Sequence, residues 1–338
     1  MRNCEACGCQ RCNIIFDALL HECELNDIRT NWKYQLLECP KCGLGFIDPT
    51  PPPEIIRTFY DSSYGPYCHT RLNPNRESNS IKYWIAKQRY ACFSAKNLWC
   101  LIKTGIGMAA ECLSGKSVSF NLGIPLQLSK TARIFELGYG SGNWLLGMAH
   151  LGYQRLAGFD IDSNEGDTFR LKAAGIEVSS GNFLENDYPD SSFDCIRLEH
   201  VFEHLTNPVK VLTKCRRMLK PGGWLLINSP CKESWSVKLS FKHFSHLDLP
   251  RHLFHHTPHS AALILEAAGL EISRIKTYGV MAAFGSTLNN YLREGGRKTI
   301  PSALFYPISP LYSFFSNITG KGDNLTILSR RPVNVTET

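Results

Sequence analysis

The sequence lacks several features that would assign it to a class of protein at once. None of its apolar runs approaches the roughly 18 to 20 residues that a membrane-spanning helix needs. Its first residues, MRNCEACGCQ, lack the apolar segment of a secretory signal, so we expect a cytoplasmic protein. The net charge is +7, but the 37 Lys and Arg residues are scattered and form no basic block. The sequence therefore gives no strong signal for nucleic-acid binding, and it leaves the oligomeric state open.

Cysteine, by contrast, is abundant and unevenly distributed. Seven of the 14 cysteines lie within residues 1–42. In a chain without a signal, such clustering favours metal binding over disulfides. Two C-x-x-C-G knuckles supply the four thiolates of a structural zinc site: Cys4, Cys7, Cys39 and Cys42. Cys9 and Cys12 allow an alternative, a local cluster with the first knuckle, but we prefer the zinc ribbon.

The pattern of residues divides the chain into three predicted segments. Residues 1–50 form the zinc-ribbon domain, which ends at the proline-rich stretch 48–53. Residues 51–130 carry aromatic and basic side chains at helical spacing and are predicted to be a helical linker or lid. Residues 131–338 alternate short apolar runs with amphipathic stretches. That alternation predicts an α/β domain whose mostly parallel sheet has helices on both faces.

A glycine-rich loop follows the first predicted strand of this third segment, Arg133 to Leu137. Its G-x-G-x-G spacing differs from the G-x-G-x-x-G of dinucleotide-binding proteins, because Asn143 stands at the sixth position. Asp160 ends the next strand, where its carboxylate can accept hydrogen bonds from ribose hydroxyls. Asn182 follows the third strand and is predicted to contact an adenine edge. These positions predict a nucleoside-containing cofactor at the carboxyl edge of the sheet.

Four stretches occur in the order and spacing of a known family: ELGYGSGNWLL, GFDID, FDCIRLEHVFEHLTNP and LKPGGWLLINSP. They resemble the motifs of class I S-adenosylmethionine-dependent methyltransferases, and the resemblance, strongest to the ubiquinone-methyltransferase-like subgroup, covers residues 131–278. It implies a seven-stranded Rossmann-like sheet with an antiparallel last strand. It assigns cofactor contacts to Glu136, Gly138, Gly140, Gly142 and Asp160, and has Asn182 where the family usually has Asp. The stretch beginning CPKCGLGFIDPT resembles the zinc ribbon that starts bacterial members of the subgroup.

The stretch HVFEH, residues 200–204, matches by itself the H-x-x-E-H signature of an inverted zinc peptidase. Here it follows a predicted strand instead of lying within a helix, and no third ligand follows, so we reject that interpretation. Two hypotheses remain. In the first, His200 and His204 shape the pocket and form hydrogen bonds with the main chain. In the second, His200, Glu203 and His204 bind a second divalent metal or act as general base, with His200 the first candidate for the base. Some ubiquinone-type O-methyltransferases resemble this segment and are thought to bind a metal with it, but they have a carboxylate in place of His200.

Several residues beyond the fifth predicted strand are expected to face the acceptor. Arg251 is predicted to hold an acidic acceptor group, and His252 belongs to a concentration of histidines beside it. We expect a small-molecule acceptor, lipophilic in character, with O-methylation favoured over C- or N-methylation. The apolar stretch 300–320 is expected to pack against the core, with contact to a lipophilic acceptor or a membrane face as the alternative. The alternatives are methylation of RNA or protein with the ribbon as substrate arm, and a cofactor-sensing module without turnover.

Overall fold

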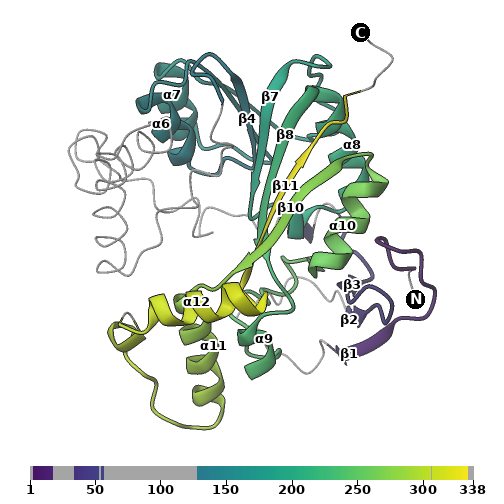
Figure 1. Cartoon of the computed structure of the whole chain (residues 1–338), viewed down its shortest axis with the longest axis vertical. Coiled ribbons are helices and arrows are strands. Elements are labelled where there is room, and N and C mark those ends of the chain that lie inside the picture. The colour runs from purple at the N-terminus through teal and green to yellow at the C-terminus, as the bar shows by residue number, and fades with distance from the viewer. Residues whose placement is uncertain (1–2, 18–33, 53–54, 57–127, 306, 334–338) are drawn as a thin grey trace.

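The computed structural model defines two sheets and the helices around them (Figure 1). Most of the predicted helical segment 51–130 lies outside the residues that the structure describes. Those residues are 3–17, 34–52, 55–56, 128–305 and 307–333.

The larger sheet has seven strands in the order β10-β11-β8-β7-β4-β5-β6. The strands are β4 (Arg133–Leu137), β5 (Arg155–Asp160), β6 (Glu177–Ser180), β7 (Phe193–Glu199), β8 (Leu219–Pro230), β10 (Glu271–Tyr278) and β11 (Asn324–Arg330). The last strand, β11, runs antiparallel to β8 and β10, whereas the other neighbours pair in parallel. This sheet confirms the predicted fold class and its antiparallel last strand.

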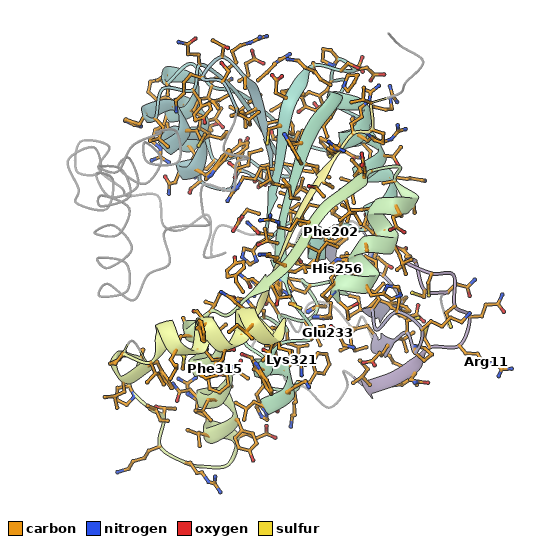
Figure 2. The ribbon with its side chains drawn as sticks, in the orientation of Figure 1. Arg11, Phe202, Glu233, His256, Phe315 and Lys321 are labelled. Atoms are coloured by element: carbon orange, nitrogen blue, oxygen red, sulfur yellow. The ribbon has the colours of Figure 1, made fainter. Side chains whose placement is uncertain are left out.

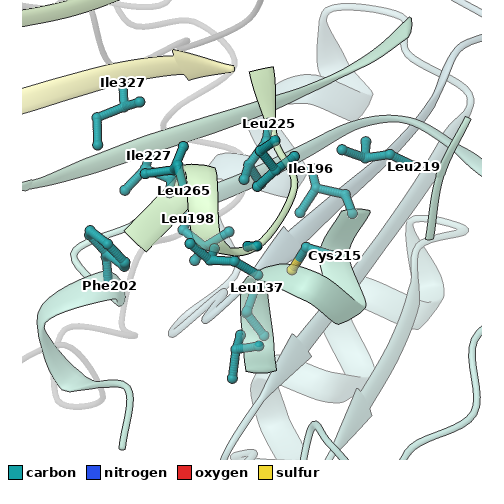
Figure 3. Close-up of a cluster of buried hydrophobic side chains, with 14 of the residues drawn as sticks. Leu137, Ile196, Leu198, Phe202, Cys215, Leu219, Leu225, Ile227, Leu265 and Ile327 are labelled. Atoms are coloured by element: carbon teal, nitrogen blue, oxygen red, sulfur yellow. The ribbon is translucent and has the colours of Figure 1, made fainter. Parts of the chain in front are cut away.

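Helices cover both faces of this sheet (Figure 1), and alternation along the strands explains why. Figure 3 shows part of the apolar cluster on one of the two faces. Ile134 faces a core cluster formed with α6 (Asn143–His150) and α7 (Glu165–Ala173). The next residue, Phe135, faces the opposite cluster, formed with α8 (Pro208–Met218) and α10 (Pro258–Ala267). Successive side chains on a strand point to opposite faces, so one apolar run fills both layers.

The helix boundaries follow polar caps that the sequence signals. The Asn164 side chain accepts from Gly166 N–H at the start of α7, and Asn207 accepts from Lys210 N–H at the start of α8. Thr257 caps α10 in a capping box with Ser260. Each of these three helices therefore begins where an Asn or Thr residue precedes the apolar pattern in the sequence.

The smaller sheet has four antiparallel strands, and its last strand comes from the C-terminal part of the chain that forms the larger sheet. Its N-terminal strands are β1 (Asn13–Asp17), β2 (Gln35–Glu38) and β3 (Gly45–Asp48), and β9 (Phe254–His255) completes it. Phe46 pairs with Phe254, and Ile47 N–H donates to the Leu253 carbonyl at 3.1 Å. The N-terminal module is thus joined to the larger domain by main-chain pairing, which the division at residue 50 did not anticipate.

Three helices gather beyond the end of the larger sheet, at the bottom of Figure 1: α9 (Trp235–Leu239), α11 (Met281–Glu294) and α12 (Ser309–Thr319). The short helix η3 (Ser302–Phe305) leads into α12. The expectation that residues 300–320 pack against the core is wrong for one face of α12, because Phe314 and Phe315 are more than half exposed. No helix among the described residues is both long enough and apolar enough to cross a membrane.

Candidate active site at the sheet switch point

The candidate site lies where the chain reverses its direction of winding, between β4 and β7. β4 pairs with β5 on one side and with β7 on the other. In open α/β sheets, ligands bind at the carboxyl ends of the strands beside such a switch point. The glycine loop 138–142 follows β4, and the HVFEH stretch follows β7. The fold therefore brings together two of the predicted elements that lie about 60 residues apart in the sequence.

The three glycines of the loop have different physical roles. All three have positive φ angles, which favour glycine: 76° at Gly138, 52° at Gly140 and 71° at Gly142. A Cβ on Gly138 would collide with the side chain of Val201, and one on Gly142 would lie 2.5 Å from Leu171. A Cβ on Gly140 would have no atom within 4 Å. Gly138 and Gly142 thus allow close packing, whereas Gly140 borders open space of the kind that a cofactor needs.

Asp160 holds the glycine loop in position. Its Oδ2 accepts from Gly140 N–H at 2.7 Å, and its Oδ1 accepts from Ile161 N–H at 2.8 Å. The residue is buried, at 5% exposure. Main-chain bonds from Gly138 N–H to the Phe159 carbonyl, 2.7 Å, fasten the same loop to β5. The carboxylate predicted to bind ribose therefore also organises the loop beside it.

Glu136, one residue from the end of β4, is buried in an ion pair. Its carboxylate contacts Arg197 on β7, which also donates to Glu199 at 2.8 Å. Burial raises the pKa of Glu136 to about 8, although Arg197 opposes this shift. Its second oxygen, Oε2, is buried with no hydrogen-bond partner among the described residues. An unpaired buried acceptor fits a ligand donor, and the predicted cofactor contact stays a prediction.

Asn182 lies at the exposed end of β6, and its amide is used locally. Its Oδ1 accepts from Leu184 N–H at 3.1 Å, and its Nδ2 donates to Glu185 at 2.5 Å. The predicted adenine contact would compete with this turn. Sequence reasoning did not single out Ile161, which directly follows Asp160 and exposes 48% of its surface. An apolar side chain beside a carboxylate that is predicted to bind ribose suits an aromatic base, and its sequence signal is only its position after a strand-ending Asp.

His200 begins the HVFEH stretch in a strained conformation, with a φ of 52°. Its Nδ1 lies 3.2 Å from Glu203 Oε1, and its Nε2 lies 4.0 Å from Glu199 Oε1. Burial lowers the pKa of His200, but the hydrogen bond and charge of Glu203 outweigh it, so the pKa is raised overall. Because Nδ1–H donates to Glu203, the neutral imidazole carries its lone pair on Nε2. That arrangement is one that a general base requires.

Glu203 is a buried carboxylate with three histidines around it. It lies in the 3-10 turn η2 (Phe202–His204), at 1% exposure, and Ser229 Oγ donates to its Oε2 at 3.0 Å. Burial opposes its ionisation, but the hydrogen bond from His200, together with the positive charge that the neighbouring histidines carry when they are protonated, holds the pKa of Glu203 well below its usual range. The turn therefore carries a carboxylate that stays ionised at neutral pH.

Glu203, His204 and His252 form a group that could hold a metal ion, with ligand atoms within 4.8 Å of one another. His204 Nδ1 donates to the Arg251 carbonyl at 2.9 Å, and His252 Nδ1 donates to the His246 carbonyl at 2.8 Å. Carbonyl oxygens only accept, so both histidines keep the Nε2 lone pair. The candidate metal group thus combines Glu203 and His204 with His252 in place of His200, although His200 is hydrogen-bonded to Glu203.

Arg251 forms an ion pair within its own loop. Its Nε lies 3.0 Å from Asp248 Oδ1, and a terminal nitrogen lies 2.6 Å from the same oxygen. An acidic acceptor would have to compete with that carboxylate for the guanidinium. His252 is buried at 7% exposure, which favours a structural contact over an acceptor contact. The predicted substrate roles of Arg251 and His252 stay predictions.

Glu199 is a site residue that sequence reasoning missed. It ends β7 at the switch point, and its Oε2 accepts from Arg197 at 2.8 Å and from Asn228 Nδ2 at 2.6 Å. Asn228 in turn accepts from Thr326 at 2.6 Å. A carboxylate directly before His200, at the end of a buried strand, was the available signal.

The four knuckle cysteines come together as predicted. The sulfurs of Cys4, Cys7, Cys39 and Cys42 lie within 4.8 Å of one another, with Cys4 3.5 Å from Cys42 and Cys7 3.4 Å from Cys39. Tetrahedral Zn²⁺ with bonds of about 2.3 Å requires sulfurs about 3.8 Å apart, so the donor set fits. Cys9 and Cys12 are outside this group and contact main-chain carbonyls instead.

The cysteine group contacts the catalytic half directly. Thr257, the cap of α10, donates its hydroxyl to the Cys42 carbonyl at 2.8 Å. Lys232 Nζ donates to the Gly43 carbonyl at 3.1 Å and pairs with Glu38. Leu253 N–H donates to the Glu203 carbonyl at 2.9 Å, while Leu253 itself precedes β9. A continuous path of contacts therefore joins the cysteines to the HVFEH turn.

Comparison with known proteins agrees with this geometry. Residues 111–275 match a family model described as a methyltransferase domain. A probable S-adenosylmethionine-dependent methyltransferase of Mycolicibacterium smegmatis is 29% identical over 155 residues, 45% of this chain and 56% of its own length. A ubiquinone biosynthesis O-methyltransferase of Shewanella pealeana is 28% identical over 105 residues, 29% of this chain and 43% of its own length.

Other relatives differ in their acceptors. A phosphoethanolamine N-methyltransferase of Plasmodium falciparum is 28% identical over 118 residues, 32% of this chain and 44% of its own length. The chain thus spans about half the length of the curated relatives it matches. Among solved structures, a putative sarcosine dimethylglycine methyltransferase from Galdieria sulphuraria has a TM-score of 0.44 at 21% identity, over 68% of this chain and 86% of its own.

Proposed function

We propose, given that this chain carries an S-adenosylmethionine-dependent methyltransferase domain, that the whole protein methylates a small molecule at oxygen. The observation that carries the proposal is the contact between the two loops at the switch point. Val201 packs on Gly138, so His200 stands beside the loop predicted to hold the cofactor. Relatives named for O- and N-methylation of small molecules support the acceptor class.

The cofactor residues fit S-adenosylmethionine. Gly140 leaves room for it, the Asp160 carboxylate lies at the same loop and is the group predicted to bind ribose, and Glu136 keeps an unpaired oxygen for a donor such as an ammonium group. When bound, the sulfonium supplies an already activated methyl group. The work left to the protein is alignment and proton removal, and alignment alone can supply about 7 to 11 kcal/mol of the barrier reduction.

His200 is the proposed general base. Its Nε2 would accept the proton from an acceptor hydroxyl as the oxygen bonds to the methyl carbon, and the carbon–sulfur bond breaks with its electron pair left on sulfur. Glu203, through Nδ1, keeps the ring in the required tautomer and stabilises the imidazolium that forms. Glu199 adds negative charge on the other side of the ring. N- or C-methylation would use the same alignment with a different acceptor atom.

The cysteine group is proposed to hold a structural zinc ion, and a divalent cation fits Glu203, His204 and His252. Glu203 and His252 are both buried, so a cation there would fix the turn and would not bind the acceptor. If that cation contributes, mild chelation that spares the cysteine site should lower turnover, and added metal should restore it. Unchanged turnover would remove the second metal from the proposal.

The ribbon is better suited to a fixed scaffold than to a substrate arm. Its strand β3 pairs with β9, and Thr257 bonds the Cys42 carbonyl, so it cannot move independently of the domain without breaking main-chain bonds. This disfavours the alternative in which the ribbon delivers RNA or protein. The fixed position of the ribbon does not test the second alternative, a cofactor-sensing module. Only an activity assay distinguishes such a module from an enzyme.

The test is transfer of labelled methyl from S-adenosylmethionine into a fractionated extract of the source cells. Label in small molecules or lipids, absent with the Asp160→Ala variant, would support the proposal and give the acceptor class. Replacing His200 with Gln should reduce turnover while leaving cofactor binding intact, and the exposed His259→Gln variant serves as the matched control. Label in RNA or protein would favour the substrate-arm alternative, and cofactor binding without any label would favour the sensing module.

A further inference from the structure

Helix α12 presents its apolar face to solvent. Leu311, Phe314, Phe315 and Ile318 expose 57%, 58%, 54% and 68% of their surfaces. Their spacing of three, four and seven residues places them on one stripe of the helix. An amphipathic helix on a globular domain normally turns such a stripe inward.

The polar face of α12 is the one that packs on the protein. Tyr312 donates its hydroxyl to the buried Asp323 carboxylate, 2.9 Å from Oδ2, and Ser313 Oγ donates to the Gly279 carbonyl at 3.0 Å. Ser316, on the same face, is fully buried. Rotating the helix to bury the phenylalanines would remove Asp323's phenol partner and expose these bonds. The orientation is therefore held by buried polar contacts.

The exposed stripe continues into the segment before α12. Leu304 and Ile308 expose 64% and 49% of their surfaces. Residues 299–320 contain no charged side chain. Contiguous exposed apolar patches of this kind mark interaction sites. We call the following residues the α12 surface: Leu304, Ile308, Leu311, Phe314, Phe315 and Ile318.

Cations border this uncharged run on both sides. Before it come the exposed Arg293, Arg297 and Lys298, and directly after it comes Lys321. Lys321 Nζ lies 4.8 Å, and Lys238 Nζ 5.4 Å, from the centroid of the Trp235 ring. Figure 2 shows Lys321 beside the end of α12. The hydrogen bond with Lys238, and then its positive charge, lower the pKa of Lys321, whereas the Glu233 carboxylate opposes this shift.

We propose that the α12 surface docks the protein on an anionic lipid bilayer, with α12 lying in the plane of the membrane. The apolar stripe would enter the acyl region, the cations would meet lipid phosphates, and Trp235 would lie at their boundary. The 11 residues of α12 span about 16 Å, well short of the ~30 Å hydrocarbon core, so the helix cannot cross it.

The charges favour a membrane over a second copy of the chain. In a twofold dimer through this surface, each cationic border would face its own copy, with like charges opposed. An anionic bilayer complements the exposed Arg293, Arg297 and Lys298, and the one carboxylate among them, Glu294, is paired with Lys242. The α12 surface also lies beyond the carboxyl ends of β8 and β10, at the edge of the sheet that carries the candidate site (Figure 1). The docking proposal stands on the surface itself and does not depend on the activity.

The experiment is co-sedimentation of the full chain with vesicles of phosphatidylcholine containing phosphatidylglycerol. Binding should weaken by about tenfold or more in the Phe314→Ser, Phe315→Ser double variant, because two side chains leave the acyl region. Phe169→Ser is the matched control, since Phe169 is 76% exposed on α7, outside the α12 surface. Replacing Lys238 and Lys321 with Gln should reduce the dependence of binding on salt.

Four results would overturn the proposal. The first is that the unaltered chain does not bind anionic vesicles, and the second is that the double variant binds them as well as the unaltered chain does. The third is that the Phe169→Ser control loses as much binding as the double variant. The fourth is that the chain binds no vesicles but forms a concentration-dependent dimer that the double variant abolishes. The substituted side chains are exposed, so circular dichroism and thermal unfolding should match those of the unaltered chain. Loss of vesicle binding with those properties unchanged would support docking even if no methyl acceptor were found.

Discussion

The side chain of Val201 lies directly against the Cα of Gly138, so the turn after β7 and the loop after β4 form one packed unit. A Gly138→Ala substitution combines a positive φ with a collision, and should reduce unfolding free energy by about 2 to 4 kcal/mol. A Gly140→Ala substitution meets no atom within 4 Å and should cost only about 1 to 2 kcal/mol.

The order should be reversed for cofactor binding, which Gly140→Ala should weaken more directly than Gly138→Ala. The added methyl of Gly140→Ala would occupy the space left for the cofactor, so titration calorimetry should detect weak binding to a nearly intact fold. Combining Gly138→Ala with Val201→Ala should restore part of the lost stability, because the collision is removed. Full cofactor affinity in Gly140→Ala would contradict this assignment of the loop.

Asp160 is expected to affect both loop order and cofactor affinity. Asp160→Ala removes the acceptor for the Gly140 and Ile161 N–H groups and should cost about 1 to 3 kcal/mol of stability. Asp160→Asn keeps one acceptor oxygen and should be less destabilising, yet should still bind S-adenosylmethionine about tenfold or more weakly because the charge is lost. Unfolding curves and calorimetry on both variants measure the two effects separately.

The dependence of turnover on pH should report the His200–Glu203 pair. A base must be neutral to accept a proton, so kcat/KM should rise with pH through the pKa of His200, which Glu203 holds above its ordinary value of 6.5. Glu203→Gln removes the negative charge, lowers that pKa and should move the rising limb to lower pH. His200→Gln should abolish the limb. If the rise of kcat/KM with pH does not shift in Glu203→Gln, a group other than His200 is responsible for it.

Metal analysis of the purified chain should find about one zinc per molecule in the cysteine group. Cys39→Ser should lose that metal and lower the melting temperature. Cys9→Ser is the matched control: Cys9 is also buried and nearby, but its sulfur lies outside the four-cysteine group. Metal retained in Cys39→Ser and lost in Cys9→Ser would place the ligands elsewhere, and iron with sulfide would exclude a zinc ribbon.

The sequence predicted the larger domain well because its signals are local and periodic. The strand Arg133–Leu137 matches its prediction, and α10 begins at Thr257 and Pro258, a capping residue followed by proline of the kind that typically starts a helix. Both rest on residues within a few positions of one another. The cysteine group was also predictable, because each short knuckle contains two of the four ligands, whatever the length of the chain between the knuckles.

Contacts between segments that are far apart in the chain could not be predicted from the sequence. Nothing in Phe254–His255 indicates an edge strand of the N-terminal sheet, because two residues carry no period. His252 joins Glu203 only because the loop folds back on η2. The outward apolar face of α12 was also mispredicted: its polar side is held inward by Asp323, whose role depends on the tertiary structure.

The pairing of β3 with β9 also affects how the chain is made. About 200 residues separate the two strands, so a ribosome working at ~5 to 20 residues per second needs roughly 10 to 40 s to supply the second. During that interval the β3 edge is unpaired and open to aggregation or chaperone capture. The N-terminal sheet is therefore completed late in synthesis, and the catalytic half acts as the folding partner of the segment that emerged first.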